Sequence, residues 1–254
     1  MHLVYALEQL PDPVVSSLFL VGPTPRATQI ASWRPEALRL LAELGYGGAV
    51  IIPEPRSGEW RHSYVDQTTW EVEMRARADL ILFWVPRELT HMPAFTTNIE
   101  FGEDYDSCRC LYGRPEGAPK NRYLDVRWQE VSGCLPHTSL RDLLTEGVGV
   151  LGEGALRHGA ERDVPLGIWR CPAFTAWHNA LQASGHVLRT FRLRYALPQG
   201  KRHPASPVLG FLSEAAIARA GDEGVTATKF FLVGPDGITT IPNYAGSGTA
   251  ASWK

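Results

Sequence analysis

The sequence predicts an α/β protein, in which a doubly wound parallel sheet is followed by a smaller α+β unit. In the first half, short apolar runs alternate with helical patterns, which is typical of βαβ units. The 254 residues are enough for a domain of about 150 residues and a smaller companion. A glycine-rich run at residues 147–159 marks the boundary, so we expect domains at residues 1–146 and 147–254.

Four apolar runs predict the strands of the sheet, and each is followed closely by proline or glycine. In chain order they are residues 17–21 (SLFLV), 49–52 (AVII), 79–85 (DLILFWV) and 109–112 (RCLY). Such runs are typical of strands that are buried in a parallel sheet.

Helices are expected in the intervals between these strands. Ser32 is a suitable N-cap, and Pro35 and Glu36 follow it in the first turn of a helix. Gly45 ends that helix. Its apolar face consists of Ala37, Leu38, Leu41 and Leu44. Further helices are expected at residues 66–78, 97–106 and 139–145, the last as part of a closing helix.

The order β-α-β-α-β-α-β predicts a Rossmann-like or flavodoxin-like sheet, whose loops gather at the carboxyl ends of the strands. These loops should rim one crevice. They carry four arginines, Arg26, Arg56, Arg87 and Arg114. Guanidinium groups suit a small anionic ligand such as a phosphate, although each of these residues taken alone is more typical of a solvated loop.

The chain beyond residue 147 predicts a small α+β unit. Strands are expected at residues 164–169, 191–195 and 229–233, with a helix at residues 174–185. Gly147, Gly149 and Gly152 match G-x-G-x-x-G, but no strand precedes them and no acidic residue is placed to hold a ribose. We therefore interpret the glycine run as a linker. The tail, residues 246–254, is expected to fray.

Charge and composition exclude several classes of partner. Lys and Arg number 25 against 27 Asp and Glu, and no basic run is interleaved with aromatic residues. We therefore expect no nucleic-acid polymer as a partner. The N-terminal residues lack the pattern of a signal peptide, and no apolar span reaches about 18 residues. A cytoplasmic protein without a membrane partner is expected.

The cysteines favour neither disulfides nor a metal. Four of them are too few for a disulfide scaffold in a chain of this size, so reduced thiols are expected. Cys108 and Cys110 are separated by one residue, where zinc motifs usually have about two to four, and this spacing disfavours a zinc site built with Cys134 and His137. We expect no metal and no cofactor.

The most informative segment is TTNIEFG, residues 96–102. It places Glu100 in the first turn of a predicted helix, just after the crevice-facing loop of the third strand. Glu71, on the preceding helix, supplies a second carboxylate. Two carboxylates in one pocket are the minimum for glycosyl chemistry, because one attacks or stabilises the anomeric carbon and the other handles protons.

Several linked segments resemble the nucleoside 2-deoxyribosyltransferase-like family. They are SLFLVGPTPR, VIIPEPR, DQTTWEVEMRARADLILFWVPRE and MPAFTTNIEFG, and the resemblance spans roughly residues 14–125. It implies that a strand-end glycine, here Gly22, holds the sugar side of the substrate. It also implies that Glu100 is a nucleophile, that Glu71 is the acidic residue on the preceding helix, and that the products are a free base and a glycosyl-enzyme intermediate.

Two positions depart from that family. Classical members carry an aspartate for the base where this sequence has Ala94, and a tyrosine near the strand-end glycine where it has Leu20. Both losses disfavour transfer between two bases. We therefore expect cleavage of the N-glycosidic bond of a nucleoside or nucleotide, with the sugar passed mainly to water. A nucleoside (deoxy)ribosyltransferase and a non-catalytic nucleotide-binding sensor are the alternatives.

Eight residues are expected to bind the substrate: Gly22, Pro23, Thr24, Arg26, Trp84, Arg87, Thr97 and Asn98. Thr97 and Asn98 would bond sugar hydroxyls or the base edge. Trp84 or Trp70 would stack on the base, because aromatic faces accept any planar heterocycle. Arg26 and Arg87 would hold a phosphate.

Residues 161–189 resemble, more loosely, the region that follows such a domain in proteins fused to a Nudix hydrolase. No Nudix box is present in the sequence, so pyrophosphate hydrolysis is not expected. Three roles stay open for the C-terminal unit: a remnant, a lid over the crevice, or the surface of a homodimer.

Overall fold

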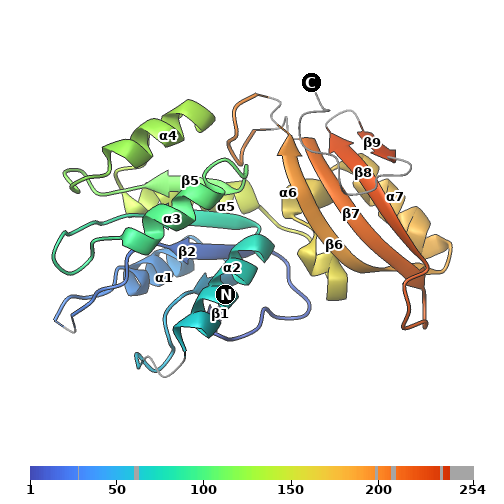
Figure 1. Cartoon of the computed structure of the whole chain (residues 1–254), viewed down its shortest axis with the longest axis horizontal. Coiled ribbons are helices and arrows are strands. Elements are labelled where there is room, and N and C mark those ends of the chain that lie inside the picture. Colours follow the sequence, from blue (N-terminus) through green and yellow to red (C-terminus); the bar gives the residue numbers. More distant parts are fainter. Residues whose placement is uncertain (28, 60–62, 198–199, 207–209, 235–236, 241–254) are drawn as a thin grey trace.

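A computed structural model describes the chain except for residues 28, 60–62, 198–199, 207–209, 235–236 and 241–254 (Figure 1). A five-stranded parallel sheet is flanked by helices, and the C-terminal part forms a four-stranded antiparallel sheet. The predicted α/β class is confirmed. No helix in the described part of the chain is long and apolar enough to cross a membrane.

The parallel sheet has the strand order β1-β3-β2-β4-β5. Its strands are β1 (His2–Tyr5), β2 (Ser17–Val21), β3 (Ala49–Ile52), β4 (Leu80–Trp84) and β5 (Cys110–Gly113). The four predicted strands are confirmed, and every residue in them is buried. The additional edge strand β1 pairs with β3 and is only partly buried, so it lacked the long apolar run that marks the others.

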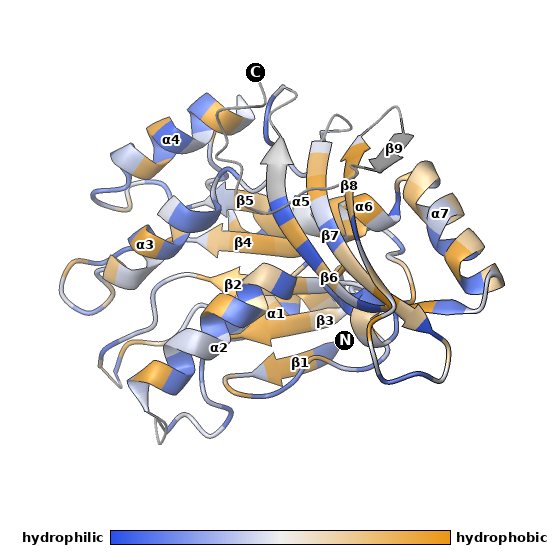
Figure 2. Ribbon diagram, turned by 45° about the vertical axis from the view of Figure 1, so that its right-hand side comes forward, coloured by the Kyte–Doolittle hydropathy of each residue, from blue (hydrophilic) through white to orange (hydrophobic). Residues whose placement is uncertain are grey.

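Helices cover both faces of this sheet. They are α1 (Arg34–Glu43), α2 (Tyr64–Arg77), α3 (Phe95–Asp104), α4 (Arg122–Ser132) and α5 (Leu140–Leu151). Figure 1 shows α2 and α3 in front of the sheet and α1 and α5 behind it. Figure 2 shows the apolar strands β2, β3 and β4 lying between helices that carry hydrophilic residues. The sequence did not predict α4, whose buried face is narrow and contains Leu124 and Trp128.

Helix starts differ from the predicted ones by one or two residues, for local reasons. Helix α2 begins earlier because the Ser63 hydroxyl accepts a hydrogen bond from the Asp66 N–H (3.1 Å) and so caps the helix. Helix α3 begins at Phe95, directly after Ala94 in a left-handed conformation. The N-cap of α1 is Trp33 and not Ser32.

The strand order reverses between β2 and β4, and this positions the candidate site. The chain steps from β2 to β3 on one side and then crosses to β4 on the other. At such a reversal the two outgoing loops separate and leave a crevice at the carboxyl ends of the strands. Gly22 directly follows β2, and a Cβ on it would lie 2.1 Å from the Trp84 carbonyl oxygen, so a side chain cannot fit at this point.

The glycine run is not a linker throughout, because α5 continues to Leu151 and Gly152 follows as its C-cap. A Cβ on Gly147 would lie 3.2 Å from the side chains of Leu80 and Leu82. Gly147 therefore allows α5 to approach β4 closely, and the predicted boundary at this residue falls inside a helix.

The C-terminal unit is an α+β structure, as expected. It contains the 3₁₀ helix η1 (Gly159–Asp163), helices α6 (Leu166–Trp169) and α7 (Pro172–Ala183), and strands β6 (His186–Leu197), β7 (Gly210–Arg219), β8 (Ala227–Gly234) and β9 (Gly237–Thr240). These strands form an antiparallel sheet in chain order. The strand predicted at residues 164–169 is wrong, because the short helix α6 begins after Pro165. The expected frayed tail, residues 246–254, lies outside the described residues.

A buried ion pair ties the two units together at the amino ends of the strands. The Arg157 Nη2 donates to the Asp79 carboxylate (2.5 Å), and both side chains are fully buried. Asp79 also accepts hydrogen bonds from the backbone N–H groups of Ser17 (2.8 Å) and Leu166 (3.0 Å). The C-terminal sheet therefore lies at the opposite end of the parallel sheet from the crevice (Figure 1), and its described residues form no lid over it.

Candidate functional site

A cavity of about 380 Å³ lies at the carboxyl ends of β2, β3 and β4. Its walls come from the loop after β2, from Pro53 after β3, and from α1, α2 and the start of α3. Six of the predicted site residues line it: Gly22, Pro23, Thr24, Arg26, Glu71 and Glu100. The fold therefore brings both carboxylates and the strand-end loop to one place.

The two carboxylates reach the cavity from neighbouring helices on the same face of the sheet. Glu71 lies in the second half of α2. Glu100 lies in the second turn of α3 and not in the first, because the helix begins at Phe95. Both residues are half-buried.

Burial raises the pKa of Glu100 to about 7, and the negative charge of Glu71 acts in the same direction. Burial also raises the pKa of Glu71, which a hydrogen bond from the Gln67 amide (2.6 Å) partly opposes. Two carboxyl groups that resist joint ionisation retain a proton near neutral pH. Such a pair can supply one anionic and one protonated group, as glycosyl chemistry requires.

The strand-end loop is held by Arg34, which the sequence analysis did not identify. Its side chain is 1% exposed and lines the cavity. The guanidinium donates to the carbonyl oxygens of Leu20 (3.2 Å) and Gly22 (2.8 Å) and to the Thr24 hydroxyl (3.1 Å), and it forms an ion pair with Glu54 (2.5 Å). Its position in the first turn of a helix beside a strand-end loop was the available signal.

Trp33 also holds the loop of residues 22–24 in place. Its indole Nε1 donates to the Pro23 carbonyl oxygen (3.2 Å). A Cβ at Gly22 would also lie 2.8 Å from the Trp33 ring. The first turn of α1 and its N-cap therefore fix the backbone of residues 22–24.

Aromatic side chains stand at the mouth of the cavity. Tyr64 and Phe95 begin α2 and α3, line the cavity, and are 73% and 64% exposed. The Arg26 guanidinium lies 5.4 Å from the centre of the Phe95 ring. Exposed rings at a pocket entrance can stack on a planar ligand, a role that the sequence analysis gave to other residues.

Four predicted binding residues do not line this cavity: Trp84, Arg87, Thr97 and Asn98. The Arg87 side chain is directed away from it, because it donates to the Lys120 carbonyl oxygen (2.8 Å) and to the Asn98 side chain. Trp84 and Thr97 are buried. Trp70 is also buried, and its Nε1 donates to the Glu8 carbonyl oxygen (2.8 Å).

The predicted arginine cluster does not assemble at the cavity. Of the four arginines, Arg26 alone lines it. Arg56 forms an ion pair with Glu8 (2.7 Å), and Arg114 forms one with Asp125 (2.8 Å). Arg26 is exposed at the rim of the cavity.

Of the two positions that depart from the pattern of that family, one lines the cavity and the other lies in the core. Ala94 lines the cavity with its backbone in the left-handed region, at φ 60°. Leu20 is fully buried within β2. Neither position offers a polar group to a substrate.

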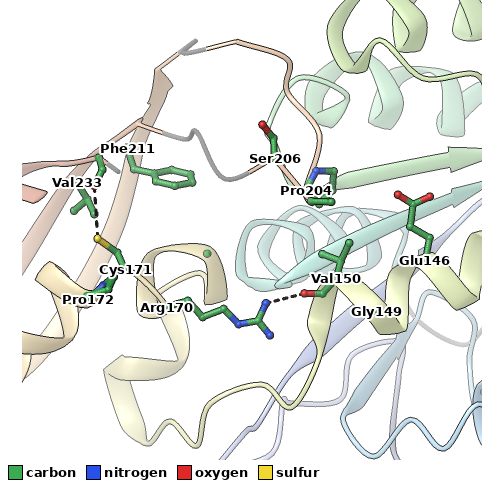
Figure 3. A pocket seen from close by; sticks show the side chains of 13 residues that line it. Glu146, Gly149, Val150, Arg170, Cys171, Pro172, Pro204, Ser206, Phe211 and Val233 are labelled. Atoms are coloured by element: carbon green, nitrogen blue, oxygen red, sulfur yellow. Dashed lines mark hydrogen bonds between the residues drawn. The ribbon is translucent and has the colours of Figure 1, made fainter. Parts of the chain in front are cut away.

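A larger cavity of about 730 Å³ lies between α5, α6 and the C-terminal sheet (Figure 3). Two of its side chains are engaged in local bonds: Arg170 donates to the carbonyl oxygens of Val150 (2.7 Å) and Leu151, and the Cys171 thiol bonds to the Gly234 carbonyl oxygen (3.6 Å). It contains one carboxylate, that of Glu146, which bonds to His137 (2.6 Å). These groups make it a poorer candidate than the cavity with the carboxylate pair.

Metal ligands are not assembled at either cavity. In the described ranges of the chain, no group of three or more His, Cys, Asp or Glu residues is arranged to hold a metal ion. The four cysteines are free thiols, and Cys108 and Cys110 are buried.

A scan against protein-family models finds no match for this chain, and a search among curated proteins finds none either. The resemblance to nucleoside 2-deoxyribosyltransferase-like proteins therefore depends on the sequence segments that carry it.

Proposed function

We propose that this protein cleaves the N-glycosidic bond of a nucleoside or nucleotide, with Glu100 as the nucleophile and water as the main acceptor of the sugar. The observation that carries the proposal is the pair of half-buried carboxylates, Glu71 and Glu100, in a strand-end cavity. The order of strands β3, β2, β4 and β5 is compatible with a flavodoxin-like relative of the nucleoside 2-deoxyribosyltransferases, which we propose as its family.

In the first step, the Glu100 carboxylate attacks C1′ while the C–N bond breaks and its electron pair leaves with the base. Because the raised pKa of Glu100 places the pair's proton mainly on Glu100 in the free protein, the step begins with transfer of that proton to Glu71, which then donates it to the leaving base. The anionic Glu100 also stabilises the oxocarbenium character of the transition state. The result is a glycosyl ester on Glu100 and a free base.

In the second step, a water molecule attacks C1′ of the ester. Its proton passes to the Glu71 carboxylate, the C–O bond to Glu100 breaks, and the free sugar or sugar phosphate leaves. The pair of carboxyl groups then returns to its starting protonation state. Glu71 acts first as acid and then as base, and the rise in its pKa on burial favours its role as a proton donor.

A panel of purine and pyrimidine nucleosides and their 5′-monophosphates tests the proposal. We expect the protein to release free base from at least one member, as measured by chromatography. Binding of a member without release of base would favour the nucleotide sensor. Neither binding nor release across the panel would contradict the proposed function.

A further inference from the structure

The Arg34 side chain is buried, and it lines the cavity of the proposed site. Each guanidinium nitrogen has a partner: Nε the Leu20 carbonyl, Nη2 the Gly22 carbonyl, and Nη1 the Thr24 hydroxyl and Glu54. A planar guanidinium group whose three nitrogens all have partners is held in one orientation. Its positive charge is therefore fixed beside the cavity.

The charges around the carboxylate pair come from several elements. On α2 and α3, Arg75 is bound to Glu103 (2.7 Å) and Asp104, so two carboxylates offset its charge. On α1, Arg34 has one carboxylate partner, Glu54, which lies after β3.

Burial raises the pKa of both carboxyl groups, and the positive charges of Arg34 and Arg75 oppose this rise at each of them; at Glu71 the hydrogen bond from Gln67 opposes it more strongly than either charge. Removal of the Arg34 charge would therefore raise both pKa values.

We propose that Arg34 is the positioning residue of this site: it fixes the loop of residues 22–24 and holds a stationary positive charge beside the Glu71–Glu100 pair. This inference rests on the proposed function for its catalytic meaning. The electrostatic part concerns the free protein and is measurable without a substrate.

The two tasks of Arg34 are separable by substitution. Lysine keeps the charge but lacks the planar fork that bonds two carbonyl groups and a hydroxyl group. Methionine keeps much of the side-chain volume and removes the charge. We therefore expect Arg34→Lys to keep the titration of the carboxylate pair and Arg34→Met to change it.

The experiment is a pH titration of protein labelled with ¹³C at the glutamate carboxyl carbons, followed by NMR. Signals of Glu71 and Glu100 are assigned by their loss in the Glu71→Gln and Glu100→Gln variants. In Arg34→Met, both midpoints should rise, by roughly 0.5 to 1 pH unit at the more affected group. In Arg34→Lys they should stay within about 0.3 unit of the wild-type values, since the charge is retained.

Arg56→Met is the matched control, because Arg56 is an exposed arginine whose ion pair with Glu8 lies outside the cavity. It should leave both midpoints unchanged. Circular dichroism establishes that each variant is folded. Unchanged midpoints in folded Arg34→Met, or equal shifts in Arg34→Lys and Arg34→Met, would overturn the inference. If Arg34→Met does not fold, the lysine variant still decides, because a shift in its midpoints as large as 0.5 unit contradicts a charge-based role.

Catalysis gives the second readout. With a substrate that releases base, Arg34→Lys should lower kcat/KM about tenfold and keep the pH at which activity rises, whereas Arg34→Met should also move that pH upward. A protein that releases no base but shows the predicted titration shifts would refute the proposed function and retain the role of Arg34 in setting the charge of the pair.

Discussion

Glu100 is accessible to a ligand and is also poorly solvated, a combination that is uncommon among surface glutamates. Its carboxyl group lies in a cavity open to a ligand, and burial together with the neighbouring Glu71 disfavours its ionised form. A poorly solvated carboxylate is a stronger nucleophile than a hydrated one, but it destabilises the folded protein when it ionises. The same property therefore predicts effects on both activity and stability.

The stability effect is a testable consequence. The pKa of Glu100 is about 7 in the folded protein and 4.5 in the reference state, so its contribution to stability is fully present below pH 4.5 and is lost as the pH rises through 7. In Glu100→Gln this loss is absent. We expect the variant to gain up to about 3 kcal/mol in the free energy of unfolding, relative to wild type, between pH 4 and pH 8.

Urea denaturation at both pH values measures this gain. Glu116→Gln is a control at an exposed glutamate outside the cavity. A difference between Glu100→Gln and wild type that stays constant with pH would show that the carboxyl group of Glu100 is not buried as described.

The residue at position 94 determines the expected acceptor. Ala94 lines the cavity and offers no carboxylate to an incoming base. When a second nucleobase is added to the reaction, we therefore expect free sugar or sugar phosphate to be the main product. Chromatography of the products measures the partition. Recovery of mostly the exchanged nucleoside would restore the transferase interpretation.

At the scale of elements, the loop after β2 and the start of α3 form the rim of the cavity, and Arg26 with Phe95 lies there. We expect a 5′-monophosphate to bind more tightly than its nucleoside, because Arg26 can pair with the phosphate. Since Arg26 is exposed, the preference lost in Arg26→Ala should be about three- to tenfold, or roughly 1 kcal/mol.

Calorimetry at low and moderate salt measures that preference. Arg56→Ala is the control for the loss of an exposed arginine outside the cavity. Equal affinity of the wild-type protein for a nucleoside and its monophosphate would contradict a phosphate site and leave the glycosidic chemistry untouched.

The sequence predicted the elements whose pattern is local and missed those that depend on packing. The strands β2 to β5 are continuous apolar runs, and such a run indicates a buried strand even when its neighbours in the sheet are unknown. Helix α4 buries only a narrow face, so its apolar pattern is weak. The need for glycine at position 147 arises from the close approach of α5 to β4, which no local sequence pattern reveals. The glycine run therefore has the composition of a linker although it begins inside α5.

Prediction of the candidate site had the same limit: positions near strand ends were predictable, and side-chain directions were not. Six predicted residues line one cavity: four from the strand-end loop, together with Glu71 of α2 and Glu100 of α3. Arg87 and Asn98 do not, because they bond to each other and Arg87 turns toward residue 120. The direction of a long side chain after a strand depends on the partners it finds, and sequence position alone does not determine it.

At the scale of the whole molecule, the fully buried pair of Arg157 and Asp79 joins the start of β4 to the C-terminal unit. Arg157→Met would leave the Asp79 carboxylate buried without its cation. We expect a loss of about 3 to 5 kcal/mol in the free energy of unfolding. The exposed Arg39, which pairs with Glu36 (2.6 Å), provides the control variant Arg39→Met, which should lose far less stability because water screens this ion pair.

Urea unfolding followed by circular dichroism measures both losses. A loss in Arg157→Met as small as that in Arg39→Met would contradict the role of this ion pair in holding the units together.

The rate of base release by Glu100→Gln, compared with wild type on the best substrate of the panel, tests the central claim most directly. Glutamine keeps the shape of the side chain and removes the nucleophilic carboxylate, so the variant should fold and lose activity by at least about a thousandfold, or ~4 kcal/mol in the barrier. A Glu100→Gln protein that retains activity within about tenfold of wild type, a change of only ~1.4 kcal/mol, would contradict the assignment of Glu100 as the nucleophile.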